Sequence, residues 1–107
     1  SLLSFLGGVN GSTYSATKGA LAQLTKSMSN EWYKLGICCN GIAPGYLKTA
    51  LNAHMAEDFK KTVLMRIPRG KFEEPDAIIG AVLFLASPAS DFVSGVILPV
   101  DGGYLAR

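Results

Sequence analysis

The stretch from Thr13 to Leu35 constrains the fold of this chain more than any other part of the sequence. Its larger apolar residues recur at spacings of three and four, which predicts a helix with one buried stripe made of Leu21, Leu24, Met28, Trp32 and Leu35. Ser12 or Thr13 can cap the start of this helix, and Gly36 can end it. We therefore expect one long helix, packed along one side against the rest of the fold.

Two short apolar segments follow this helix. Residues 37–42 are almost continuously apolar, as strands of parallel sheets are, and Ala43-Pro44-Gly45 is expected to end that strand. Residues 96–100 predict a second buried strand. Between the strands we expect a helix from about Ala50 to Met65 and another that begins near Pro75 and extends to Ala86.

Tyr14 and Lys18 stand one helical turn apart at the start of the long helix, so they share a face. A phenol is too weak an acid for easy proton transfer near neutral pH, and a fixed ammonium beside it stabilises the phenolate. The pair can therefore serve as a general acid and base on a rigid element. By itself the spacing is common, and the alternative is an ordinary surface pair.

Composition and charge exclude several classes of function. The net charge is +2 and no basic cluster alternates with aromatic residues, so we expect no nucleic-acid partner. The apolar runs are too short to span a membrane, and the start has no signal-peptide pattern. Cys38 and Cys39 are adjacent and are expected to face opposite sides of a strand as free thiols, which predicts a cytoplasmic protein. His54 is the only histidine, too few ligands for a metal site.

Four separated motifs occur in a fixed order. Ser1 opens the first, thirteen positions before Tyr14, and the Tyr14–Lys18 stretch is the second. Residues 37–49 follow the helix as the third, and residues 94–104 close the chain as the fourth. This order resembles the C-terminal half of the short-chain dehydrogenases/reductases, nicotinamide-dependent enzymes of Rossmann fold. Glu31-Trp32, Arg66-Ile67-Pro68 and the last seven residues resemble the branch that acts on gluconate-type sugar acids. That branch includes 2-deoxy-D-gluconate 3-dehydrogenases and 2-dehydro-3-deoxy-D-gluconate 5-dehydrogenases.

The resemblance implies an α/β fold in which residues 1–107 form the C-terminal part of one domain. That part would belong to a Rossmann-type, doubly wound parallel sheet, and residues 46–69 would be the lid over the substrate. No glycine-rich phosphate loop occurs in the sequence, so the half of the fold that binds the dinucleotide phosphates is expected to be absent. The chain therefore looks like a fragment.

The resemblance also assigns roles to individual residues. The implied reaction interconverts a secondary alcohol and a ketone, on a sugar acid or polyol, with NAD or NADP as cofactor. Tyr14 would transfer the hydroxyl proton, Lys18 would support it and hold the nicotinamide ribose, and Ser1 would polarise the reacting oxygen. Ser4 is a poorer fit than Ser1, since it stands closer to Tyr14. The residues implied to lie against the cofactor are Tyr14, Lys18, Pro44, Gly45, Leu47 and Thr49, and those against the substrate are Ser1, Tyr14 and Tyr46.

The resemblance implies a homo-oligomer, and the residues leave alternatives open for Thr49, His54 and the function. By resemblance, helix 13–35 would contact its copy in a homodimer or homotetramer, aided by its small residues Ala16, Gly19, Ala20 and Ala22. Thr49 could instead be a helix cap, and His54 could be a lid-edge residue or a substrate contact. The alternative function is a non-catalytic fragment, a binding or oligomerisation piece of such an enzyme that is inactive alone.

Overall fold

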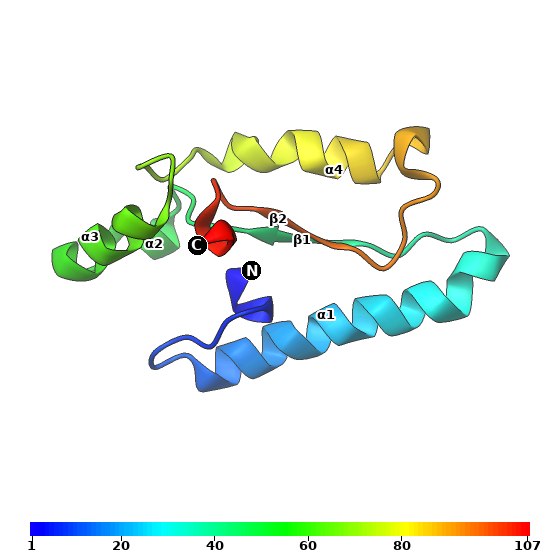
Figure 1. Cartoon of the computed structure of the whole chain (residues 1–107), viewed down its shortest axis with the longest axis horizontal. Coiled ribbons are helices and arrows are strands. Elements are labelled where there is room, and N and C mark those ends of the chain that lie inside the picture. The colour runs from blue at the N-terminus through cyan, green and yellow to red at the C-terminus, as the bar shows by residue number, and fades with distance from the viewer.

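A computed structural model describes residues 1–107 and shows a small sheet flanked by helices on both sides (Figure 1). Helix α1 (Ser12–Trp32) lies along one face, and α4 (Ile79–Leu85) lies along the other. The sheet contains β1 (Gly41–Pro44) and β2 (Ile97–Val100). Two further helices, α2 (Ala50–Ala53) and α3 (Glu57–Arg66), lie beyond one end of the sheet. Five 3₁₀ turns complete the chain: Leu2–Ser4, Tyr33–Leu35, Pro75–Ile78, Pro88–Ser90 and Tyr104–Ala106.

The two strands are parallel, which confirms the expected α/β class with a parallel sheet. Gly41 pairs with Ile97 and Pro44 with Val100, so the strands end side by side. Both carboxyl ends point toward the end of the molecule that holds α2, α3, the start of α1 and both termini (Figure 1). Loops at the carboxyl ends of parallel strands are where such folds place ligands.

The first strand begins later than the sequence predicts, at Gly41 instead of Ile37, and it includes Ala43 and Pro44. The cause is Asn40, whose side chain replaces the backbone ladder: Nδ2 donates to the Val93 carbonyl at 2.7 Å, and Oδ1 accepts from the Val96 N–H at 3.1 Å. Cys38 and Cys39 therefore precede the strand rather than lying within it, and both are free thiols.

Helix α1 occurs as predicted, but its cap and its buried face differ from the prediction. Gly11 occupies the N-cap position without a side-chain cap, so neither Ser12 nor Thr13 caps the helix. A 3₁₀ turn extends the helix to Leu35, and Gly36 ends it with a φ of 78°, which favours glycine. The residues that α1 buries are the small Ala22 and Ser29, whereas four of the five stripe residues are exposed: Leu21, Leu24, Trp32 and Leu35. No helix in the structure is both long and apolar enough to cross a bilayer.

The single helix predicted from about Ala50 to Met65 is two helices, because residues 54–56 interrupt it. Ala56 has extended backbone angles and precedes Glu57 and Asp58 in the first turn of α3. Acidic residues favour a helix N-terminus, so this pair was the sequence signal for a new helix start. The later helix begins at Pro75 as predicted, although its first turn is a 3₁₀ turn and α4 proper starts at Ile79.

The buried apolar cluster of the chain joins its two ends to the segment that follows β1. Its members come from four separate segments and are Leu2, Val63, Ile67, Phe72 and Tyr104. Partly buried side chains pack around them: Leu6, Tyr46, Met55, Leu64 and Leu105. The cluster therefore fixes the ends of the chain against α3, next to the carboxyl ends of the strands.

Candidate functional site

Hydrogen bonds attach the first residues of the chain to the N-terminal half of α1. The Ser4 hydroxyl donates to the Lys18 carbonyl at 3.1 Å, and the Ser15 hydroxyl accepts from the Gly8 N–H at 3.2 Å. Leu2 is buried in the apolar cluster beside them. The 3₁₀ turn that follows Ser1 is therefore held both to the helix that carries Tyr14 and to the lid.

Tyr14 and Lys18 come together as the helical spacing predicts. The Lys18 ammonium nitrogen lies over the Tyr14 ring, 5.3 Å from its centroid, in cation–π geometry. The Tyr14 side chain is 49% exposed, so its phenol is open to solvent. The pair is thus a phenol and an ammonium group in contact on one helix.

Ser1 lies on the same side of the structure as this pair. Its Oγ accepts a hydrogen bond from the Leu3 N–H at 3.2 Å and caps the first 3₁₀ turn. The turn that Ser1 caps is hydrogen-bonded to α1 through the Ser4 hydroxyl and the Lys18 carbonyl, so residue 1 lies near the helix that carries the pair. Ser4 is committed to the Lys18 carbonyl, so of the two serines Ser1 has the hydroxyl free to donate.

The segment after β1 is held closely against the segment after β2. The Gly45 N–H donates to the Val100 carbonyl at 2.9 Å, and a Cβ at position 45 would lie 2.7 Å from the Asp101 Cα. Only glycine fits there. The Asp101 carboxylate in turn accepts from the Gly103 and Leu105 N–H groups at 2.8 and 2.9 Å. The Pro44-Gly45 turn therefore packs on a self-bonded turn at the end of the second strand.

Leu47 and Thr49 continue this segment into α2. The Leu47 carbonyl accepts from the Asn52 side chain at 2.8 Å, while the Leu47 N–H makes no hydrogen bond within the chain. Thr49 stands at the N-cap position of α2 but makes no side-chain capping bond, so its hydroxyl is available. Pro44 is part of β1, paired with Val100.

Tyr46, expected to touch the substrate, lies within an aromatic group. Its ring is stacked on Phe72 at 5.5 Å between centroids, and Tyr104 lies at the same distance with a tilt of 49°. Burial raises the pKa of the Tyr46 phenol above its usual value, and the nearby Arg66 opposes that shift. The structure thus places the Tyr46 ring in contact with two other aromatic rings, next to the buried apolar cluster.

The basic residues of the lid are mostly neutralised by carboxylates. Lys60 and Lys61 pair with Glu57 and Asp58 within α3, and these pairs are exposed. Arg66 alone, among the six cations between residues 48 and 71, has no carboxylate within 4.0 Å. Its guanidinium carbon lies over the Tyr104 ring at 4.4 Å. Arg66 is therefore the cation of this stretch that no carboxylate of the chain neutralises.

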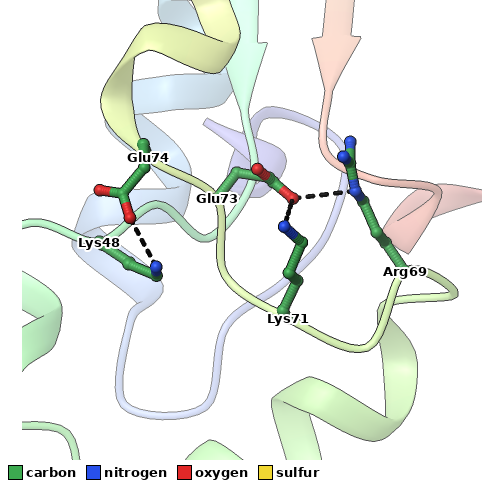
Figure 2. Close-up of polar contacts among 5 residues, drawn as sticks. All are labelled: Lys48, Arg69, Lys71, Glu73 and Glu74. Atoms are coloured by element: carbon green, nitrogen blue, oxygen red, sulfur yellow. Dashed lines mark hydrogen bonds and ion pairs between the residues drawn. The ribbon is translucent and has the colours of Figure 1, made fainter.

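A charged group that the sequence did not single out lies where the lid rejoins the fold. Glu73 Oε1 contacts Arg69 Nε at 2.9 Å and Lys71 Nζ at 3.1 Å, and Lys48 pairs with Glu74 beside it (Figure 2). Arg69, Lys71 and Glu73 line a small pocket of about 120 Å³ with Leu47 and Val100. Its sequence signal was a charged residue at every second position from Arg69 to Glu73.

Comparison with known proteins places these features in a family. The family described as enoyl-(acyl carrier protein) reductase matches residues 1–105. The chain is 51% identical over 109 aligned positions to 2-dehydro-3-deoxy-D-gluconate 5-dehydrogenase of Bacillus subtilis (strain 168), and 43% identical to the protein of that name from Escherichia coli (strain K12). Each comparison covers the whole chain and 43% of the relative.

A solved structure agrees with the sequence relatives. The gluconate 5-dehydrogenase of Burkholderia cenocepacia J2315, crystallised with NADP and tartrate, superposes with a TM-score of 0.96 at 43% identity. That superposition covers all of this chain and 43% of the solved chain, so the chain spans less than half the length of the proteins it matches. The parallel sheet, the helix that carries Tyr14 and Lys18, and these matches agree with the resemblance seen in the sequence. The chain belongs to the short-chain dehydrogenase/reductase family.

Proposed function

We propose that the protein containing this chain is an NAD(P)-dependent oxidoreductase that interconverts a secondary alcohol and a ketone on a sugar acid. The observation that carries the proposal is the contact between Lys18 and the solvent-open Tyr14. That contact stands at the end of α1 that lies by the carboxyl ends of both strands (Figure 1). Family membership and the sugar-acid dehydrogenases among the relatives support the choice of reaction.

Three residues would perform the proton chemistry. Tyr14 accepts the substrate hydroxyl proton during oxidation and returns it during reduction, because its phenol is open to a ligand. The Lys18 ammonium stabilises the phenolate and so makes the transfer easier near neutral pH. Ser1 donates a hydrogen bond to the reacting oxygen and holds it close to Tyr14. The bound nicotinamide supplies the hydride chemistry.

The residues after β1 fit a flat amide-bearing ring such as nicotinamide. Gly45 lets the backbone approach closely, with no side chain above the turn. The free Leu47 N–H can donate to a carboxamide oxygen, and the Thr49 hydroxyl has no partner in the cap it forms. Pro44 fixes the direction of the chain as it leaves the strand. Lys18 would also hold the ribose of NAD or NADP.

A carboxylated substrate fits the free cation of the lid. Residues 46–69 would close over the substrate, and within them Arg66 offers a guanidinium that no carboxylate of the chain neutralises. Its stacking on Tyr104 keeps the planar group oriented, which suits bidentate binding of a carboxylate. Tyr46 packs against Tyr104, the ring on which Arg66 stacks. We also propose that its hydroxyl contacts the substrate.

The test is a Tyr14→Phe substitution in the full-length protein, assayed with sugar acids and NAD or NADP by nicotinamide absorbance. Loss of the phenolic proton donor should lower kcat by about 100-fold or more. Tyr33→Phe is the matched control, since Tyr33 lies beyond the other end of α1 and its hydroxyl only donates to the Asp91 carbonyl. Equal activity in the two variants would show that Tyr14 is not the proton donor, and a wild-type protein without activity would favour the alternative, a non-catalytic binding or oligomerisation piece.

Two broader features belong to the same proposal. We propose a homodimer or homotetramer in which α1 contacts its copy, and the exposed side chains of Leu21 and Leu24 support this surface. Replacing Leu24 by Asp should then reduce the mass measured by light scattering.

We also propose a cytoplasmic location, which fits the free thiols of Cys38 and Cys39.

A further inference from the structure

We propose that Glu73 is a positioning residue that couples the end of the lid to the segment that faces the cofactor. This inference rests on the proposed function, because residues 44–49 are given their cofactor role there. Glu73 contacts both regions, through its main chain on one side and its carboxylate on the other.

The main chain of Glu73 holds the cofactor-facing segment. Leu47 and Glu73 form an isolated parallel β-bridge, and the Lys48 N–H donates to the Glu73 carbonyl at 2.7 Å. The Lys48 ammonium also pairs with the next carboxylate, Glu74, which raises the pKa of Lys48. The backbone of Glu73 is therefore paired with the backbone of residues 47 and 48, next to the free N–H of Leu47. A shift of Glu73 would move this segment with it.

The carboxylate of Glu73 holds the end of the lid. Its Oε1 takes two cations, Arg69 and Lys71, from the turn that links α3 to Glu73 (Figure 2). The Glu73 side chain is 23% exposed, whereas those of Arg69 and Lys71 are 61% and 58% exposed. The ammonium of Lys71, and after it the guanidinium of Arg69, lower the pKa of Glu73, in agreement with a carboxylate that takes part in ion pairs.

The turn itself is in contact with the rest of the site. Gly70 has a φ of 71°, and its N–H donates to the Ile67 carbonyl at 2.8 Å, so the turn is tight. Ile67 is buried in the apolar cluster with Leu2, and a side chain at Gly102 would meet it. Loss of the Glu73 carboxylate charge would therefore release Arg69 and Lys71 in this turn. It would also loosen the Glu73 main chain, whose carbonyl accepts from the Lys48 N–H.

The experiment compares Glu73→Gln with Glu57→Gln in the full-length protein. Both changes remove one carboxylate charge, but Glu57 pairs only with Lys60 on the exposed side of α3. We expect Glu73→Gln to speed hydrogen exchange within residues 47–49 at the Lys48 amide, which donates to the Glu73 carbonyl, by about fivefold. We also expect it to raise the Kd for NADPH or NADH, measured by nicotinamide fluorescence, by about fivefold, with little change in kcat at saturating cofactor. Glu57→Gln should leave both measurements unchanged.

Lys71→Gln is a milder second variant, because Arg69 would still hold the carboxylate. It should give smaller changes in the same direction, and exchange rates in α1 would report whether each variant is folded. Faster exchange at residues 69–73 alone, with residues 47–49 and the cofactor Kd unchanged, would overturn the coupling. If the wild-type protein binds neither cofactor, the proposed function fails, while the exchange at residues 47–49 still decides whether Glu73 couples the two segments.

Discussion

The carboxyl end of the sheet and its two helical flanks are built in different ways. At the carboxyl end, residues from distant parts of the chain bury one another, as Leu2, Val63 and Tyr104 do. On the flanks, α1 and α4 leave large apolar side chains exposed: Leu24 is 52% exposed and Leu83 is 63% exposed. The buried cluster of this chain therefore lies at the carboxyl end of the sheet, while Leu51 and Met65 on α2 and α3 are exposed.

This difference has a physical consequence for the site. A residue that is packed on several sides has few alternative positions, so the groups attached to it keep their geometry. Ser1 adjoins buried Leu2, and the Gly45 turn lies on the Asp101 turn. The helical flanks depend mainly on their own backbone hydrogen bonds. Substitutions should therefore have much larger effects at the carboxyl end than on the flanks.

The largest effect is expected at Gly45. Gly45→Ala would place a methyl group 2.7 Å from the Asp101 Cα, so one of the two backbone segments must move. We expect a loss of about 3 kcal/mol in the free energy of unfolding, measured by urea denaturation, together with loss of cofactor binding. The control is Gly80→Ala on α4, where a methyl group meets nothing within 4 Å. That variant should gain about 0.5–1 kcal/mol, because alanine favours helix.

Shortening one buried and one exposed side chain to alanine compares the buried apolar cluster with the helical flank α4. Val63 is 2% exposed, and Val63→Ala should destabilise the protein by about 2 kcal/mol through lost burial and a cavity. Leu83→Ala removes more carbon from α4, yet its effect should stay within about 0.5 kcal/mol where the side chain remains exposed. A large loss at Leu83 would mean that this flank is covered in the complete protein, by further polypeptide or by a second copy.

A substrate test separates sugar acids from polyols. Arg66→Gln should raise KM for a sugar acid by about tenfold, since a charge-assisted hydrogen bond is lost, and should leave KM for an uncharged polyol unchanged. Lys61→Gln is the control, because Lys61 pairs with Asp58 on the exposed side of α3. Equal changes for both substrates would show that Arg66 acts only through the shape of the lid.

The smallest expected effect is an alkaline loss of stability that depends on Tyr46. Burial favours the neutral phenol, so the pKa of Tyr46 is higher in the folded chain than in the unfolded one. Its stabilising contribution is complete below about pH 10, the unfolded value, and is lost as pH rises through the folded pKa. Tyr46→Phe should flatten the thermal stability profile in that alkaline range, and an unchanged profile would show that another group causes the loss.

Much of this arrangement was predictable from local sequence patterns, and the rest was not. The α1 helix, the Tyr14–Lys18 contact and the second strand follow from periodicity and spacing, which are local properties. The start of β1 was wrong because the Asn40 side chain replaces backbone pairing with residues more than fifty positions away. The exposed stripe on α1 and the role of Glu73 likewise depend on which distant surfaces meet, and no periodic pattern records that.

The central claim is that the nicotinamide end of a cofactor binds at the carboxyl end of the sheet. Its most direct test is amide hydrogen exchange of the full-length protein with and without saturating NADP or NAD. We predict slower exchange at residues 12–18 and 45–49 in the presence of cofactor, and no change at residues 79–85 in α4. Cofactor binding that leaves residues 12–18 and 45–49 unprotected would contradict the account.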